Sequence, residues 1–157
     1  MKMPALYVSH AQEAGRVKAR EGSLLHAMGC MLYWAEGAKD RNQLNFVNSN
    51  SGMMLMFVRF LKEEMGVNPQ TEIAIRIHCH SNEPTEMQRV EQYWLSLLSL
   101  PQEALRKTIF KQGSVTSKKV LPNGVCSIRV KRSTYLTQHI FGAVQEYSKY
   151  EMPELLL

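Results

Sequence analysis

The chain has 157 residues, a length typical of one domain with a single hydrophobic core. Hydrophobic residues make up 45% of it and charged residues 21%, which excludes the low-hydrophobicity composition of a disordered chain. No apolar run approaches the ~20 residues of a membrane-spanning helix, and the N-terminus lacks a signal-peptide core. We therefore expect a cytoplasmic protein without a membrane partner.

The positive charge is concentrated in the C-terminal half. The whole chain carries a formal net charge of +5. Between Pro101 and Tyr135, eight lysines and arginines face one carboxylate, Glu103, which leaves the rest of the chain slightly acidic. A basic segment of this kind favours a polyanionic partner.

The three cysteines, Cys30, Cys79 and Cys126, are odd in number, widely spaced and flanked by apolar residues. A disulfide framework is therefore not expected, and the sequence predicts reduced, buried thiols.

Hydrophobic periodicity predicts alternating helices and strands in the first half of the chain. A helix is expected from Ser23, a capping residue, to Gly37, a stop signal, and an earlier helix around Gln12–Arg20. A short strand is expected at Gln43–Asn48. A turn at Asn48–Gly52 then leads into a helix over Met53–Met65, whose apolar positions include Leu55, Met56, Phe60 and Leu61.

The second half continues this alternation. Strict alternation predicts a strand over Glu72–His80, with Ile73, Ile75, Ile77 and Cys79 on one face. Pro84 is expected to start a helix to about Leu98, Pro101 a helical turn to about Arg106, and Ile109 a strand. Asn123-Gly124 predicts a hairpin between Lys119–Leu121 and Val125–Val130, and a last helix is expected over Tyr135–Tyr147. This order predicts an α+β fold.

The segment Leu32-Tyr33-Trp34-Ala35-Glu36-Gly37, followed by a strand ending in Asn48-Ser49 and an apolar helix, resembles the LAGLIDADG homing endonucleases. Met31–Lys39 and Val144–Tyr147 are also similar to segments of uncharacterised bacterial relatives of that fold. The resemblance implies an α+β fold with helices packed on one face of a small antiparallel sheet. It also implies one domain over residues 1–157, with an N-terminal extension at 1–22, a core at 23–147 and a tail at 148–157.

The resemblance also implies a site. In that family two motif helices pack side by side, and each presents one carboxylate to a divalent metal beside the scissile phosphates. Carried over to this chain, Glu36 is the catalytic residue, and Glu36 with Ala35 binds Mg²⁺. Since the chain holds one motif, a nuclease of this type must be a homodimer, with Ala27, Gly29, Met31 and Trp34 at the helix contact. Bulky Met31 and Trp34 stand where the family places small residues.

Basic and polar residues are the candidates for contacts with duplex DNA. Arg129 and Lys131 alternate with apolar residues on the last strand, where arginines can bond guanine edges and lysines can neutralise phosphates. Each single residue can equally be a solvated surface residue. The expected DNA-binding residues are Lys39, Asn45, Asn48, Arg76, His78, His80, Lys118, Lys119, Arg129, Lys131 and Arg132.

His78-Cys79-His80 is the one sequence cluster that suggests a transition metal, because alternation places both imidazoles on one face. Two ligands do not complete a zinc site, and further ligands would have to come from Glu83, His26 or His139. A polar face turned toward DNA or solvent is the preferred interpretation.

Three functions remain open at this point. The first is a metal-dependent homodimeric DNA endonuclease, and the second is a noncatalytic DNA-binding regulator on the same scaffold. The third is a protein-interaction module whose basic face meets an acidic partner.

Overall fold

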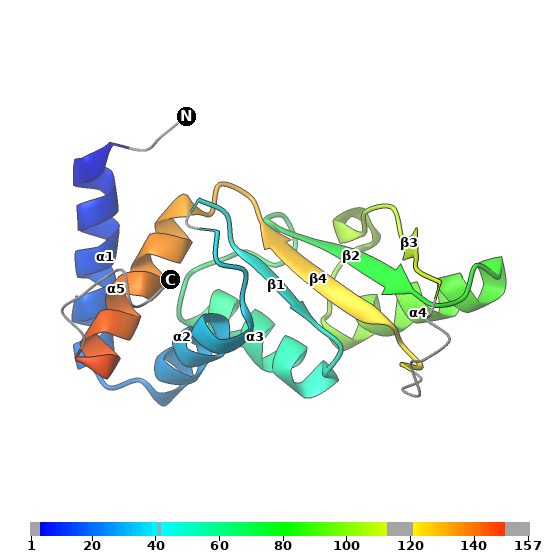
Figure 1. The fold of residues 1–157 in the computed structure, drawn as a ribbon, viewed down its shortest axis with the longest axis horizontal. Helices are drawn as coiled ribbons and strands as arrows, with labels where there is room; N and C mark the ends of the chain where they lie inside the picture. Colours follow the sequence, from blue (N-terminus) through cyan, green and yellow to red (C-terminus); the bar gives the residue numbers. More distant parts are fainter. Residues whose placement is uncertain (1–3, 41, 113–120, 150–157) are drawn as a thin grey trace.

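The computed structural model describes residues 4–40, 42–112 and 121–149 of the chain. These residues form helices and strands in the order expected, including the helical turn after Pro101, except for the strand expected at Lys119–Leu121 (Figure 1). The elements are α1 (Ala5–Arg20), α2 (Leu24–Glu36), β1 (Asn45–Asn48), α3 (Ser51–Glu63), β2 (Ile73–Cys79), α4 (Pro84–Leu97), the 3-10 helix η1 (Gln102–Ala104), β3 (Ile109–Phe110), β4 (Val125–Val130) and α5 (Thr134–Ser148).

The strands form one sheet in the order β1-β4-β2-β3. The central strand β4 pairs antiparallel with β1, where Asn45 faces Arg129, and with β2, where Arg76 faces Ser127. The edge strand β3 runs parallel to β2, with His78 facing Ile109. The sheet is therefore mixed rather than fully antiparallel, because α4 carries the chain from β2 back to a parallel position beside it.

The predicted hairpin at Asn123-Gly124 needs correction. Strand β4 pairs with β1 on one side and with β2 on the other, so neither edge of β4 is left for a hairpin partner. Leu121 is not in a strand. Residues 119 and 120 of the expected partner strand lie outside the described residues. A turn at Pro122-Asn123 is present, and Gly124 has φ +57° with its Cα so close to β2 that a Cβ would lie 2.2 Å from the His78 carbonyl oxygen.

Helices α2, α3 and α4 cover one face of the sheet, and none of the described helices covers the other, which we call the open face (Figure 1). The core between the two layers contains the inward residues of β2 and β4 together with Phe46, Phe57 and Trp94, all fully buried. The α+β class, with helices packed on one face of the sheet, is therefore confirmed. The three cysteines are free and buried, also as predicted.

Most elements lie within a few residues of their expected bounds. The first helix begins at Ala5 rather than Gln12, and α3 begins at Ser51 because the Asn50 side chain accepts a hydrogen bond from the Met53 amide. Leu55 is 46% exposed, so its assignment to the apolar face of α3 is wrong. Met53–Val58 is a continuous apolar run, and such a run does not define the phase of a helix.

Helix α1 lies against α5 at one end of the molecule (Figure 1). Glycines allow their backbones to approach closely: a Cβ at Gly15 would lie 1.9 Å from the His139 carbonyl oxygen, and one at Gly142 would lie 1.9 Å from that of Gln12. The segment expected as an N-terminal extension thus forms a helix that packs onto the rest of the chain.

Candidate nucleic-acid interface

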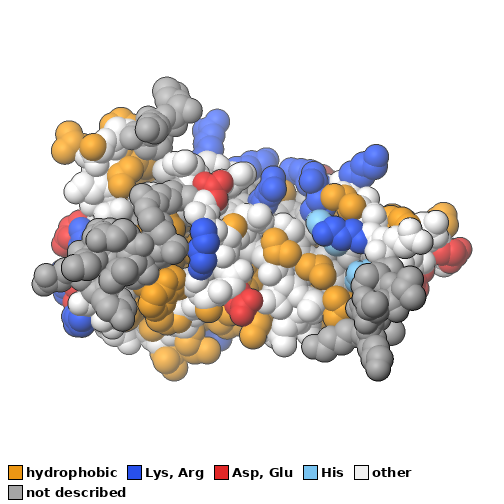
Figure 2. Space-filling model, in the orientation of Figure 1, with side chains coloured by type: hydrophobic (Ala, Val, Ile, Leu, Met, Phe, Trp, Pro, Cys, Tyr) orange, Lys and Arg blue, Asp and Glu red, His pale blue; other side chains and the backbone are white. Residues whose placement is uncertain are grey.

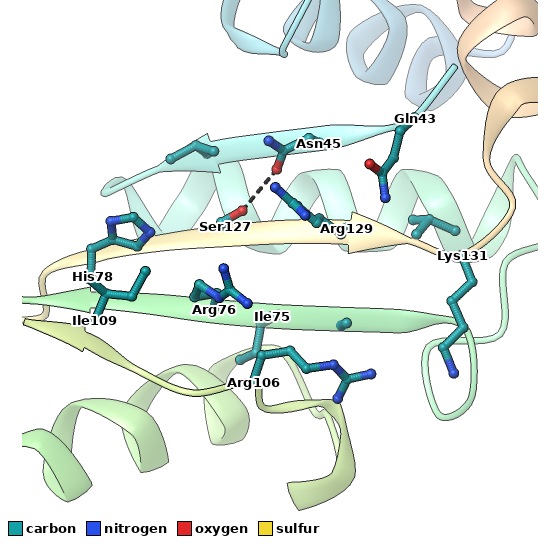
Figure 3. A pocket seen from close by; sticks show the side chains of 13 residues that line it. Gln43, Asn45, Ile75, Arg76, His78, Arg106, Ile109, Ser127, Arg129 and Lys131 are labelled. Atoms are coloured by element: carbon teal, nitrogen blue, oxygen red, sulfur yellow. Dashed lines mark hydrogen bonds between the residues drawn. The ribbon is translucent and has the colours of Figure 1, made fainter. Parts of the chain in front are cut away.

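The open face of the sheet is hollowed and positively charged. The hollow has a volume of about 430 Å³ (Figure 3). Four cations, Arg76, Arg106, Arg129 and Lys131, contribute to its lining, and no carboxylate among the described residues does. The remaining lining residues are Gln43, Asn45, Val47, Ala74, Ile75, His78, Ile109, Ser127 and Val130. Lysines and arginines also gather on this side in the space-filling view (Figure 2).

Strand alternation places these side chains on one face. In β2, Ile73, Ile75 and Ile77 point into the core, so Arg76 and His78 point outward. In β4 the same alternation buries Ile128 and leaves Arg129 exposed. Among the described residues, neither Arg76 nor Arg129 forms an ion pair with a carboxylate.

Arg106 belongs to the hollow but was not among the expected DNA-binding residues. Its backbone amide donates to the Ile75 carbonyl at 2.8 Å, and Leu105 forms a parallel bridge with Ile75, so this segment runs along the edge of β2. The basic pair Arg106-Lys107 was visible in the sequence. Its position beside β2 was not, because it depends on the return of the chain after α4.

Asn45, Ser127 and Arg129 form the centre of the face. The Ser127 hydroxyl donates a hydrogen bond of 2.9 Å to the Asn45 side-chain oxygen (Figure 3). Asn45 is directly opposite Arg129, and Ser127 is directly opposite Arg76. Ser127 itself is 7% exposed, so its hydroxyl is almost fully enclosed.

His78 lies at the far end of the hollow from Lys131 (Figure 3). Partial burial lowers the pKa of His78, and the nearby charges of Lys111 and Arg76 lower it further. His80 lies beyond the end of β2, where its Nδ1 is 3.3 Å from the Lys111 carbonyl oxygen, and it does not line the hollow. Among the described residues no group of three or more His, Cys, Asp or Glu can hold a metal ion, and neither His78 nor His80 belongs to one.

Other expected DNA-binding residues have structural roles outside the hollow. The Lys39 ammonium donates to the Trp34 carbonyl and so caps the last turn of α2. The Asn48 side chain accepts from the Asn50 amide at 2.8 Å, which shapes the turn before α3. Arg132 is exposed in the turn after β4, at φ 51°. Lys118 and Lys119 lie outside the described residues.

Glu36, the expected catalytic residue, is exposed at the end of α2 and lies outside the hollow. Within the described part of the chain its carboxylate has no ion pair and no hydrogen bond. One carboxylate and the Ala35 carbonyl are too few donors to form a magnesium site within one chain, because Mg²⁺ takes six oxygen ligands. The donor set of a single chain therefore does not fit the metal, and catalysis by Glu36 stays a prediction that requires a second copy.

The expected dimer helix, α2, is packed partly within its own chain. Gly29 is buried against α3, and a Cβ there would lie 2.1 Å from the Phe60 ring. The close contact at Gly29 is therefore an intrachain one. Ala27, Met31 and Trp34 are half-buried, while Leu24 and Met28 are the exposed large apolar residues of this helix. The homodimer stays a prediction.

The described helices include none that is long and apolar enough to cross a membrane. The resemblance to LAGLIDADG endonucleases remains an expectation from the sequence. No protein-family model, no curated protein and no solved structure matches this chain.

Proposed function

We propose that this protein binds duplex DNA through the open face of its sheet. The observation that carries the proposal is the hollow lined by Arg76, Arg106, Arg129 and Lys131 without a carboxylate. Side chains of this kind neutralise phosphates, and phosphate neutralisation with release of counterions supplies most of the affinity of non-specific DNA binding.

The composition of the face favours a duplex over a single strand. Proteins that bind single strands stack bases on exposed aromatic rings. The hollow has no Phe, Tyr or Trp in its described lining, and Phe46, the aromatic residue of β1, points into the core. Strands that present cations at every second position can instead lie in a groove of the duplex. A DNA-binding role also agrees with the cytoplasmic location expected from the sequence.

The affinity for a duplex of ~20 base pairs, measured by fluorescence anisotropy at several salt concentrations, tests the proposal. Neutralisation of phosphates by four cations predicts a slope of log K against log salt of roughly −4. Arg76→Ala and Arg129→Ala should each weaken binding and reduce the steepness of the slope by about 1.

Arg59→Ala is the matched control. Arg59 is an exposed arginine on α3, behind the sheet, and it pairs with Glu63 at 2.9 Å. Its loss should leave both affinity and slope unchanged. Absence of duplex binding even at low salt would reject the proposal and favour the protein-interaction module, for which an acidic protein is the partner to seek.

A further inference from the structure

The centre of the open face offers hydrogen-bond donors in a defined arrangement. Asn45 and Arg129 are opposite each other on β1 and β4, and side chains directly opposite have Cβ atoms ~4.5–5.5 Å apart. Arg76 faces Ser127, two positions along β4 from Arg129, so it lies diagonally across from Arg129 on the same face. These three side chains project into the hollow together (Figure 3).

Ser127 determines what Asn45 can offer a ligand. Its enclosed hydroxyl donates to the Asn45 side-chain oxygen at 2.9 Å, which uses one of the two lone pairs of that oxygen and turns the oxygen toward Ser127 (Figure 3). The amide nitrogen, with its two N–H groups, has no partner among the described residues. A guanidinium has donors and no acceptor. Asn45, Arg129 and Arg76 together therefore present donors.

Base edges differ in what they can accept from such a surface. Guanine shows two acceptors in the major groove, N7 and O6, whereas adenine shows one acceptor and one donor. The usual bidentate contact of asparagine with adenine needs the side-chain oxygen and the NH₂ group to face the same base edge, whereas in this chain the oxygen faces Ser127. The arrangement of Asn45, Arg129 and Arg76 therefore favours guanine over adenine.

We infer that Asn45 is a specificity-determining residue, held as a donor by Ser127, and that the face prefers duplexes whose guanines are contacted in the major groove. This inference rests on the proposed function, since it assumes that the face binds DNA. It goes beyond that function by naming the base, the groove and the residue that sets the preference.

Three duplexes of equal length test the inference by anisotropy: a G·C-rich duplex, the same duplex with 7-deazaguanine, and the same duplex with inosine. 7-Deazaguanine lacks the N7 acceptor, and inosine lacks the minor-groove amino group. Affinity should fall about fivefold or more with 7-deazaguanine, the loss expected for one base contact, and should change less than about twofold with inosine. An A·T-rich duplex should also bind about fivefold more weakly.

Ser127→Ala frees the Asn45 side-chain oxygen and should reduce the preference for G·C over A·T about fivefold, with binding to A·T-rich duplex retained. Ser96→Ala removes an exposed hydroxyl from α4 and is the matched control, with no expected change. Asn45→Ala, which removes the donor itself, should abolish part of the 7-deazaguanine effect and provides a second variant if Ser127→Ala does not fold.

The outcomes separate this inference from the proposed function. Duplex binding that is insensitive to 7-deazaguanine and to base composition would overturn the inference and leave the proposed function intact. A loss of affinity with inosine instead would overturn the assignment to the major groove. Absence of binding to every duplex at low salt would overturn both.

Discussion

At the scale of single residues, a buried histidine pair joins α2 to α5. The His26 Nε2 lies 2.9 Å from the His139 Nε2, and the His26 Nδ1 lies 2.8 Å from the Tyr147 hydroxyl. One imidazole must donate and the other accept, so the contact exists only while at least one ring is neutral. Burial lowers the pKa of His139 to about 4, with smaller contributions from His26 and Lys18, and burial also lowers the pKa of His26.

This pair predicts acid-sensitive stability. Between pH 6.5 and about 4 the unfolded chain carries a proton on His139 that the folded chain lacks, so the free energy of unfolding falls as the pH falls. The expected loss from His139 is ~1.4 kcal/mol per pH unit within this range. Denaturant unfolding at pH 7, 6 and 5 measures this slope, and the stability contribution of the pair is fully present above pH 6.5.

His139→Asn should flatten the pH dependence, whatever its effect on the absolute stability. His10→Asn is the control, because His10 is exposed on α1 and makes no such pair. An unchanged slope in His139→Asn would show that other groups, such as the Glu64 carboxyl beside Lys18 and Ser23, control the acid transition.

Glu36 provides a second residue-level test, which separates catalysis from binding. If a homodimer brings two Glu36 carboxylates to a divalent metal, the protein should nick plasmid DNA in Mg²⁺ or Mn²⁺, and Glu36→Gln should abolish nicking while duplex affinity is kept. Glu63→Gln, at an exposed carboxylate on α3, is the control. Absence of cleavage by the unchanged protein in either metal would leave the noncatalytic regulator.

At the scale of elements, glycines determine how the helices pack. Gly29 allows α2 to lie against the Phe60 ring, and Gly15 and Gly142 let α1 and α5 approach backbone to backbone. Periodicity in the sequence marks the apolar side of each helix, but it does not show which helix lies opposite. The resemblance led us to expect that Gly29 would contact the same helix of a second copy. In the structure, Gly29 instead contacts the Phe60 ring of its own chain.

The α1–α5 crossing gives a prediction about stability. Gly15→Ala would place a Cβ 1.9 Å from a backbone carbonyl oxygen, which cannot move aside as a flexible side chain can. We expect a loss of ~2–3 kcal/mol in the free energy of unfolding, at the upper end for overpacking. Thermal and denaturant unfolding measure it.

Gly52→Ala is the matched control for that substitution. A Cβ at Gly52 would have the Asn50 side-chain oxygen at 3.3 Å as its nearest neighbour, on an exposed turn of α3. It should leave stability unchanged or slightly raise it, because alanine favours a helix. Equal stability of the two variants would mean that α1 contributes little to the fold.

At the scale of the whole molecule, placing α2, α3 and α4 on one face of the sheet leaves the other face to the cations. The basic residues of the last strand were identified from the sequence, and Arg76 and His78 from the alternation of β2. Arg106 was not, because it reaches the hollow only through the bridge of Leu105 to Ile75. Lys39 and Asn48 also lie outside the hollow, since each serves the end of a neighbouring helix.

The sequence by itself determined the class of the fold, the order of its elements apart from the expected strand at Lys119–Leu121, and which face of β2 and β4 is polar, because hydrophobic periodicity and helix capping are local properties of the chain. Only the tertiary structure decided that β3 is parallel, that α1 packs on α5, and that Ser127 holds Asn45 across 82 positions of sequence. Those contacts join distant segments, and their partners are selected by shape and by the crossover of the chain. The charge of the open face is thus a property of the sequence, and its geometry is a property of the fold.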